Sequence, residues 1–394
     1  MDSFSYYMPA RLIFGPGKLA ELATTSYFPW GKALLVIGSG GAMRRSGTLA
    51  RVQSLLASRG VAVLVYDKIK PNPEMEQVEE AARIARKADC DVVVGLGGGS
   101  TIDSAKSIAM LAKNPGRYWD YIMSGTGGRK IPVNGALPIV AITTTAGTGT
   151  ESDPWTVQTN PQTREKIGWG TDCTYPTLSI VDPELMISLP PKQTAYTGMD
   201  AFFHSAEAYL ATCHQPASDL LALDAVSRLT KWLPVAVADG SNIEARTSVA
   251  WANTEAGICE SLSSCISHHS LEHALSAFYP AVAHGCGLTM LSVAYFGDVA
   301  ERNPERFADL ARAMGEDVDA LADAERPFAF IKALEKLIAA AGLAGEKFSD
   351  YGVKKSDIPA MAQNALTAMG GLFACTPVKQ EQADVERIFE RAYR

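Results

Sequence analysis

The chain has 394 residues, of which 47% are hydrophobic and 20% charged, a composition typical of a globular protein with two or three domains. Its net charge of −7 argues against a nucleic-acid-binding protein, whose surface is usually basic. No apolar run approaches the ~18 residues of a membrane span, and neither a secretory signal nor a C-x-x-C pair is visible. We therefore expect a cytoplasmic protein with reduced cysteines, no nucleic-acid partner and no membrane partner.

Short apolar runs alternate with amphipathic stretches in the first half of the chain. Helix-like segments lie around residues 46–59 and 74–87, between the first three of these runs. Near-continuous apolar strands separated by helices are typical of βαβ units with a buried parallel sheet. The sequence predicts a Rossmann-like α/β domain over residues 1–187, with strands at Ala33–Gly38, Val61–Asp67, Asp91–Gly97, Leu137–Thr144 and Leu178–Asp182.

Three glycine-containing loops follow these strands. Gly95-Leu-Gly-Gly-Gly-Ser100 precedes a helix predicted over 100–111, where backbone N–H groups and the helix dipole favour an anion such as a diphosphate. A tight strand-to-helix turn explains the same glycines equally well, and Asp103, taken alone, best fits a capping box. The other two loops are 38–41 (GSGG) and 143–151 (TTTAGTGTE). Open α/β sheets bind ligands at the carboxyl ends of strands, so three such loops favour a nucleotide site.

The pattern changes after Leu189-Pro190-Pro191, where helical periodicity replaces strand-like runs. Apolar residues recur at i, i+4 and i+7 within 219–233, and Ser218 or Asp219 is expected to cap that helix. The sequence therefore predicts an all-helical domain over residues 188–394.

All six histidines fall within this second half, between His204 and His284. Asp200 and His204 share a helix face at i, i+4 spacing, and His269 and His273 repeat that spacing. One carboxylate with three imidazoles suits Zn²⁺ or Fe²⁺. Spacing leaves open which three histidines bind the metal, and whether the metal polarises an alcohol oxygen or activates water. We expect His214 and His268 to be structural.

In combination, these motifs resemble the iron-containing (group III) alcohol dehydrogenases, a family related to glycerol dehydrogenase and dehydroquinate synthase. The resemblance covers most of the chain and implies a Rossmann-like parallel-sheet domain followed by an all-helical one. It rests on FGPGKL (14–19), Pro71-Asn72-Pro73, GGGSTIDSAK (97–106), TTAGTGTE (144–151), Asp182-Pro183, GMDAFFHSAE (198–207) and HHSLEHALSAFYPAVAHG (268–285).

The resemblance also assigns roles to individual residues. His273 and Asp103 match residues near the nicotinamide, and His273 is a candidate proton relay. One extra residue separates His273 from His284 relative to the commonest spacing. The matching metal ligands are Asp200, His204, His269 and His284. The matching cofactor-binding residues are Gly38, Ser39, Asn72, Gly98, Gly99, Ser100, Thr144, Thr145, Thr148 and Lys166.

The nucleotide preference depends on the end of the first strand. NAD-preferring members of the family carry an aspartate there, whereas this chain has Gly38 followed by Ser39, as in members that use NADP. Arg44 and Arg45 follow closely and suit a 2′-phosphate. Asp67 would suit NAD by the ordinary Rossmann rule, so the question stays open, with NADP(H) favoured over NAD(H).

We expect a metal-dependent, NAD(P)-linked alcohol dehydrogenase that acts reversibly on small primary alcohols and aldehydes, with NADPH favoured and Fe²⁺ or Zn²⁺ bound. Both ligands are expected in the cleft between the domains, and the resemblance implies a homodimer or a higher homo-oligomer. The alternatives are a hydroxyacid–oxoacid transhydrogenase and a dehydroquinate synthase-like lyase on the same scaffold. The scarcity of Lys and Arg around 269–284 argues against the lyase.

Overall fold

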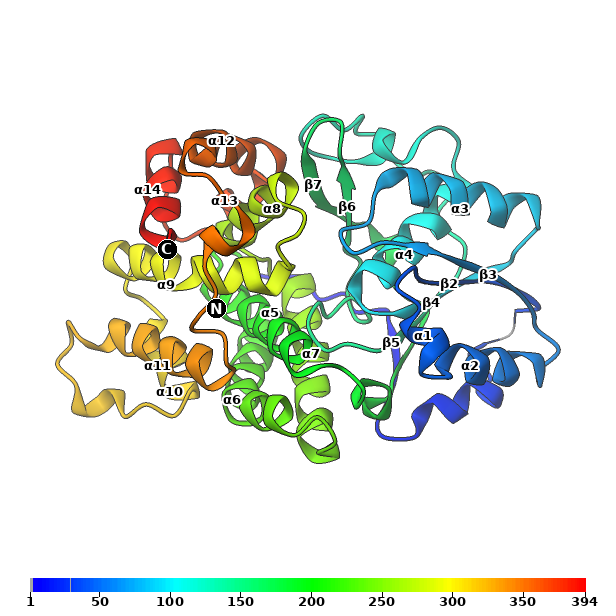
Figure 1. Cartoon of the computed structure of the whole chain (residues 1–394), viewed down its shortest axis with the longest axis horizontal. Coiled ribbons are helices and arrows are strands. Elements are labelled where there is room, and N and C mark those ends of the chain that lie inside the picture. The colour runs from blue at the N-terminus through cyan, green and yellow to red at the C-terminus, as the bar shows by residue number, and fades with distance from the viewer. Residues whose placement is uncertain (1–2, 29) are drawn as a thin grey trace. The chain divides into compact units, whose positions relative to one another are not determined.

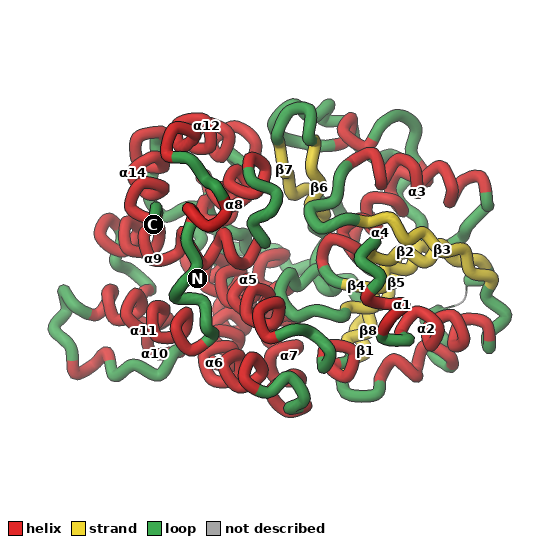
Figure 2. Tube along the Cα trace, viewed as in Figure 1, coloured by secondary structure: helices red, strands yellow, loops and turns green. Residues whose placement is uncertain are grey.

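The computed structural model describes residues 3–28 and 30–394, and the chain forms two compact units (Figure 1). The α/β unit is Met8–Ser188, and the helical unit is Leu189–Arg394 together with the segment that ends at Tyr7. All strands of the described residues belong to the α/β unit, as the yellow segments of Figure 2 show. The predicted fold class, a parallel-sheet domain followed by a helical one, is confirmed.

A six-stranded sheet, parallel throughout, forms the centre of the α/β unit, with strand order β1-β8-β5-β4-β2-β3. Five of its strands overlap the predicted ones, and the edge strand β1 was not predicted. A separate antiparallel hairpin, β6–β7, was also missed. The strands are β1 (Arg11–Phe14), β2 (Lys32–Gly38), β3 (Ala62–Ile69), β4 (Val92–Gly97), β5 (Ile139–Thr143), β6 (Thr156–Asn160), β7 (Glu165–Trp169) and β8 (Leu178–Val181).

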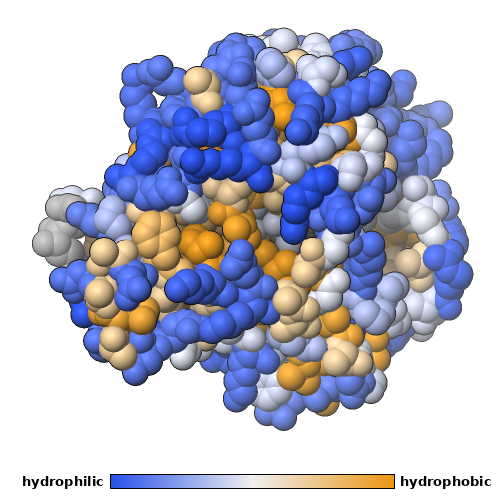
Figure 3. Space-filling model, turned by 60° about the vertical axis from the view of Figure 1, so that its left-hand side comes forward, coloured by the Kyte–Doolittle hydropathy of each residue, from blue (hydrophilic) through white to orange (hydrophobic). Residues whose placement is uncertain are grey.

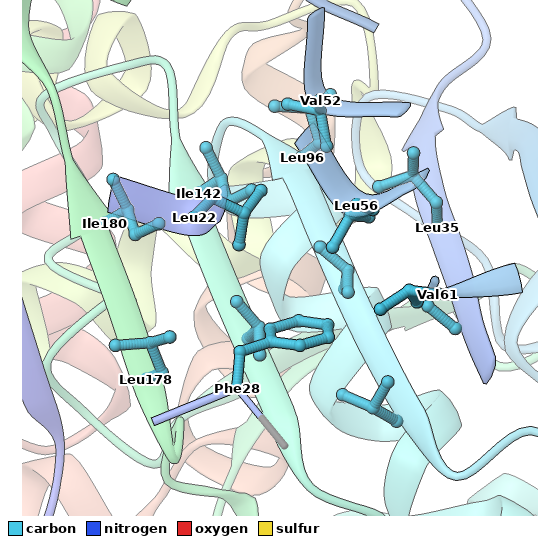
Figure 4. Packing of buried hydrophobic residues seen from close by; sticks show 14 of the residues in the cluster. Leu22, Phe28, Leu35, Val52, Leu56, Val61, Leu96, Ile142, Leu178 and Ile180 are labelled. Atoms are coloured by element: carbon cyan, nitrogen blue, oxygen red, sulfur yellow. The ribbon is translucent and has the colours of Figure 1, made fainter. Parts of the chain in front are cut away.

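Helices cover both faces of this sheet. Helix α2 (Thr48–Ala57) packs on one face through Val52 and Leu56, against Leu35 of β2 and Leu96 of β4 (Figure 4). Each fully buried side chain of this kind contributes about 1.5–3 kcal/mol. Gly95 points to the opposite face, where an added Cβ would lie 3.0 Å from the Cβ of Ala105 on α4 (Gly99–Lys113). The remaining helices of the unit are α1 (Ala42–Arg45) and α3 (Met75–Lys87).

The helical unit starts with three long helices that pack against one another, α5, α6 and α7. Helix α6 begins at Pro216 with Gln215 as its N-cap, so the prediction that Ser218 or Asp219 caps it is wrong. Ser218 instead accepts a hydrogen bond from the Gln215 N–H (3.1 Å). Its helices are α5 (Pro191–Leu210), α6 (Pro216–Ala238), α7 (Ile243–Leu262), α8 (Ser267–Phe278), α9 (His284–Arg302), α10 (Phe307–Ala313), α11 (Arg326–Ala340), α12 (Ile358–Ala368), α13 (Gly371–Ala374) and α14 (Gln382–Ala392).

The segment before Tyr7 belongs to the helical unit because it is bonded there. The Gln215 side chain donates from Nε2 to the carbonyl oxygens of Ser5 (3.1 Å) and Leu262 (2.9 Å). This amide therefore joins the first described residues to the ends of α6 and α7.

Polar side chains cover most of the face shown in Figure 3, and apolar ones gather in smaller patches among them. Within residues 3–28 and 30–394, no helix combines the length and the apolar character that a membrane span requires.

Candidate active site

The three predicted glycine loops lie at one edge of the sheet. They follow β2, β4 and β5, which are adjacent and parallel: Leu96 pairs with Ile37 on one side, and Gly97 pairs with Thr143 on the other. The loop after β5 is held against the loop after β4 by a hydrogen bond from the Thr144 N–H to the Gly97 carbonyl oxygen (2.9 Å). Residues 38–41, 97–100 and 143–151 therefore share the edge where open α/β sheets bind ligands.

Gly98 and Gly99 are required by close packing between two of these loops. An added Cβ would lie 2.3 Å from Thr148 Cγ2 at Gly99, and 2.8 Å from Thr145 Oγ1 at Gly98. Helix α4 begins at Gly99, and no side chain of the described residues caps its first turn. Its N-terminal amides, together with Ser100 and the threonine hydroxyls, thus form a cradle that fits a diphosphate.

Asp103 does not cap helix α4, because the N-cap is Gly98. Its carboxylate accepts hydrogen bonds from Thr150 Oγ1 (2.6 Å) and from the Val157 N–H (3.0 Å). Burial raises the pKa of Asp103 to about 6. The side chain therefore holds the segment that follows the threonine loop.

Lys106, one turn further along α4, was not singled out from the sequence, although it ends the quoted GGGSTIDSAK motif. It is fully buried and forms an ion pair with Asp153 (2.8 Å). Its ammonium also donates to the carbonyl oxygens of Asp153 (2.8 Å) and Trp155 (2.9 Å). Two charged side chains of α4 thus fix the backbone of residues 150–157.

The structure brings the segments of Asn72 and Lys166 together. Asn72 lies in the loop after β3 with φ of 50°, and the next residue, Pro73, accepts a hydrogen bond from the Thr159 N–H of β6 (2.7 Å). Thr159 pairs directly with the buried Lys166 across the β6–β7 hairpin. Both residues predicted to reach the nucleotide sugar therefore belong to one local arrangement.

The residues that bear on nucleotide preference are also in contact. Gly38 ends β2, and a Cβ added there would meet its nearest atoms at 3.7 Å, an ordinary contact distance. The exposed Arg44 forms an ion pair with the exposed Asp67 (2.7 Å), and Arg45 donates to the Gly40 carbonyl oxygen (2.8 Å). An exposed pair of this kind contributes at most about 1 kcal/mol, so a phosphate can compete for Arg44.

In the helical unit, three imidazoles surround one carboxylate oxygen. Asp200 Oδ1 lies 3.7 Å from His204 Nδ1, 3.7 Å from His269 Nε2 and 3.4 Å from His284 Nε2. Asp200 and His204 stand one turn apart on α5, while His269 comes from α8 and His284 opens α9. The rings of His204 and His269 stack with centroids 4.4 Å apart.

A glycine lets His284 join this group. At Gly285, an added Cβ would lie 1.9 Å from the carbonyl oxygen of Tyr196, so the start of α9 runs directly against the backbone of α5. The His284 imidazole reaches Asp200 from the first position of α9.

The donor set fits a divalent cation. Asp200 Oδ1 and His269 Nε2 are buried, and neither has a hydrogen-bond partner among the described residues. An unsatisfied buried polar atom costs about 1–3 kcal/mol, a cost that a coordinated cation would offset. Although burial alone raises it, neighbouring His204 and His284 bring the pKa of Asp200 below its usual value. The carboxylate is therefore ionised, as a ligand must be.

His273 lies beside these four residues. It is buried one turn beyond His269 on α8, and its ring centroid is 5.4 Å from that of His284 and 6.4 Å from that of His269. It is thus placed to contact whatever binds at the cluster.

The other two histidines have local partners. His214 Nδ1 lies 3.0 Å from Asp219 Oδ2, at the start of α6. His268 is fully buried between Glu207 (2.7 Å) and the Leu288 carbonyl oxygen (3.0 Å).

Sequence reasoning missed three glutamates that contact the imidazoles, Glu207, Glu260 and Glu272. The sequence could have indicated Glu207, because it lies three residues after His204 on the same helix. Glu260 reaches the cluster from the end of α7, a connection that no sequence spacing indicates.

Two family models cover the chain. The model described as "Iron-containing alcohol dehydrogenase" matches residues 9–183, and the C-terminal model of the same family matches residues 194–393. The chain belongs to the iron-containing alcohol dehydrogenase family. It is therefore an oxidoreductase that acts on alcohols, and its family uses a metal and a nicotinamide cofactor.

Individual members of the iron-containing alcohol dehydrogenase family resemble this enzyme over nearly its whole length. The 1,3-propanediol dehydrogenase of Citrobacter freundii is 34% identical over 396 residues, with 99% of each chain covered. The NAD-dependent methanol dehydrogenase of Bacillus methanolicus is 33% identical, with 98% of this chain and 97% of the relative covered. A solved archaeal halo-thermophilic alcohol dehydrogenase from a Red Sea brine pool superposes with a TM-score of 0.93 at 34% identity, covering 99% of both chains.

Proposed function

We propose that this enzyme interconverts small primary alcohols and aldehydes by reversible hydride exchange with a nicotinamide nucleotide. The observation that carries the proposal is the convergence of Asp200, His204, His269 and His284, with two buried ligand atoms left unsatisfied. These four residues would hold Fe²⁺ or Zn²⁺. Two of the relatives are named for small alcohols, 1,3-propanediol and methanol, which supports a small substrate.

Each unit contributes a separate part of the chemistry. A bound cation supplies a Lewis acid for the substrate oxygen, and the nicotinamide supplies or accepts the hydride. His273 takes the hydroxyl proton during alcohol oxidation and returns it during aldehyde reduction, because its ring lies against the ligand cluster. Gly98, Gly99 and Ser100 bind the diphosphate through backbone amides, and Thr144, Thr145 and Thr148 line the same cradle.

Asp103 and Lys106 act as positioning residues in this proposal. Both are buried and hold the segment after the threonine loop, so they act on the nicotinamide side without touching substrate. Asn72 and Lys166 contact the nucleotide sugar from the β3 loop and the hairpin.

NADP(H) is the proposed nucleotide, because Gly38 and Ser39 put no carboxylate where it would repel a 2′-phosphate. Asp67 is the residue that opposes this preference, and it is paired with Arg44. At Gly38 an added Cβ would meet its nearest atoms at an ordinary contact distance, so the variant Gly38→Asp tests this assignment. It should lower kcat/KM with NADPH about tenfold or more and spare NADH. An unchanged NADPH/NADH ratio of kcat/KM would contradict the assignment of Gly38.

We further propose that the enzyme is cytoplasmic and forms a homodimer or a higher homo-oligomer. The seven cysteines are all free thiols, which supports a reducing compartment. Light scattering of the purified enzyme tests the oligomeric state.

The reaction is tested with the purified enzyme loaded with Fe²⁺ or Zn²⁺, by following NADPH and NADH absorbance with a panel of short aldehydes. We expect turnover with propanal or butanal. Cofactor binding without turnover of any aldehyde would contradict the proposal. Activity that appears only with paired hydroxyacid and oxoacid substrates, without free cofactor, would favour the transhydrogenase. Conversion of a phosphorylated substrate without net redox change would favour the dehydroquinate synthase-like lyase.

A further inference from the structure

Each imidazole that faces Asp200 has a second carboxylate at its other ring nitrogen. The atoms that face Asp200 are Nδ1 of His204, Nε2 of His269 and Nε2 of His284. The opposite nitrogens of the three rings face three different glutamates, listed with their histidines: His204 with Glu260, His269 with Glu207, and His284 with Glu272. The arrangement is therefore three independent carboxylate–imidazole pairs around a common centre.

The His269–Glu207 pair is the most enclosed of the three. Glu207 is fully buried, and its Oε1 accepts from His269 Nδ1 at 2.7 Å. Its Oε2 accepts from the Ile266 N–H (2.9 Å), at the position that precedes α8. The carboxylate is thus held at both oxygens.

The His284–Glu272 pair is supported by a glycine. The fully buried Glu272 accepts a hydrogen bond from His284 Nδ1. An added Cβ at Gly287 would lie 2.9 Å from Glu272 Cγ and 3.0 Å from Oε1. Gly287 therefore leaves the space that the Glu272 side chain occupies.

The His204–Glu260 pair is looser. Its atoms, His204 Nε2 and Glu260 Oε2, are 3.6 Å apart, longer than a hydrogen bond but within ion-pair distance. Glu260 is buried near the end of α7, and Cys265 Sγ also lies 3.6 Å from its Oε2. We therefore expect this carboxylate to act mainly through its charge.

We propose that Glu207 and Glu272 are positioning residues for the metal centre, each fixing one imidazole so that its other nitrogen presents a lone pair toward Asp200, and that Glu260 supports His204 mainly through its charge. The inference rests on the proposed function, in which these imidazoles hold a divalent cation. A carboxylate that accepts the far N–H sets the tautomer, fixes the ring orientation and makes the ligating nitrogen more basic.

The charges of these carboxylates also favour a bound cation. Asp200 and the three glutamates bring four carboxylates to one buried cluster, so the site attracts a cation beyond what three neutral imidazoles and one aspartate would. Loss of an outer carboxylate commonly weakens metal binding about 10- to 100-fold. Glu207 and Glu272, which form hydrogen bonds, should contribute more than Glu260.

The test compares Glu207→Gln, Glu272→Gln and Glu260→Gln with Glu255→Gln as the matched control. Glu255 is a buried glutamate on α7 that interacts with Asp224 and Arg228 and belongs to none of the three pairs. The readouts are the Kd for Zn²⁺, from competition with a chromogenic chelator, and the visible spectrum of the Co²⁺-loaded protein. Far-UV circular dichroism shows which variants fold.

We expect the Kd for Zn²⁺ to rise about 10- to 100-fold in Glu207→Gln and Glu272→Gln, less in Glu260→Gln, and to stay unchanged in Glu255→Gln. The Co²⁺ bands should shift in the first two variants, because the ligand field changes.

A further variant, Gly287→Ala, keeps every charge but displaces Glu272, so it should weaken Zn²⁺ binding in the same direction. If a glutamine variant fails to fold, Gly287→Ala still tests the inference. An unchanged Kd in folded Glu207→Gln and Glu272→Gln, or in folded Gly287→Ala, would overturn the inference. Failure of the wild-type enzyme to bind Zn²⁺ or Co²⁺ at all would instead overturn the proposed metal site itself.

Discussion

The two units of this enzyme are suited to their ligands by different kinds of chemical group. The α/β unit presents backbone amides, hydroxyls and glycines, and its buried charges, Asp103 and Lys106, hold only neighbouring protein segments. The helical unit gathers carboxylates and imidazoles, and two of its buried ligand atoms, Asp200 Oδ1 and His269 Nε2, have no hydrogen-bond partner among the described residues. A diphosphate is a large anion that many weak dipoles can bind, whereas a single small cation requires concentrated charge. The α/β unit therefore offers an anion many dipoles, and the helical unit offers a cation concentrated charge.

The largest effect is expected in the helical unit, from His269→Ala. Removal of one of the four proposed ligands should abolish bound metal and lower kcat by about 1000-fold or more, since the Lewis acid is lost. His273→Ala should keep the metal and lower kcat about 100-fold, because only proton transfer is impaired. Metal content by mass spectrometry and steady-state kinetics separate the two.

His214→Ala is the control for these variants, because His214 pairs with Asp219 outside the ligand cluster. It should retain both metal and activity. Loss of metal from His273→Ala, with metal retained in His269→Ala, would mean that ligand and proton relay are assigned the wrong way round.

An intermediate effect is expected in the α/β unit, from Gly99→Ala. The new methyl group would lie 2.3 Å from Thr148 Cγ2, so the two loops must separate. Overpacking of this kind costs about 1–3 kcal/mol, which corresponds to roughly a 5- to 150-fold rise in the Kd if it falls on nucleotide binding. Nucleotide fluorescence titration measures it.

Metal content should be unchanged in Gly99→Ala, which sharpens the contrast between the units. Gly345→Ala, outside the three loops and at a position where an added Cβ meets nothing within 4 Å, provides the control. Equal nucleotide affinity in Gly99→Ala and wild type would show that the packed loops do not form the cradle.

The last comparison concerns pH, Asp103 and the folding stability of the α/β unit. Its pKa is raised by burial from 3.8 to about 6, so between these values the folded state keeps a proton that the unfolded state releases. Stability from this group is therefore present below about pH 4 and lost as pH rises to about 6, a change of about 3 kcal/mol. The difference in unfolding free energy between wild type and Asp103→Asn, measured in urea, should fall by that amount over this range.

A difference that stays constant with pH would contradict the raised pKa of Asp103. Bound metal should not differ between wild type and Asp103→Asn, because Asp103 acts only within the α/β unit.

Local patterns in the sequence predicted most of this enzyme. The apolar runs predicted the strands of the sheet, and the glycines predicted the loops. The i, i+4 spacing predicted that Asp200 and His204 share one helix face and that His269 and His273 share another. These features are predictable because neighbouring residues along the chain produce them. The resemblance added His284, which no spacing links to Asp200.

The features that were missed depend on contacts between distant residues. Strand β1 is a four-residue edge strand, and β6 (TVQTN) is too polar to stand out as a strand. Asp103 looked like a cap because it follows Ser100 by three residues, yet its partners, Thr150 and Val157, lie about fifty residues away. The carboxylate on His284 is likewise visible only once α8 and α9 are packed.

The bond between Gln215 and Ser5 has a consequence for synthesis. Its partners are 210 residues apart, and the whole α/β unit lies between them in the chain. At a translation rate of about 5–20 residues per second, the segment around Ser5 waits roughly 10 to 40 seconds for Gln215 to appear. The α/β unit has that interval to fold on the ribosome, and the two sequence segments of the helical unit can join only afterwards. The hydrogen bond between Gln215 and Ser5 therefore forms late in folding, because Gln215 is synthesised after the whole α/β unit.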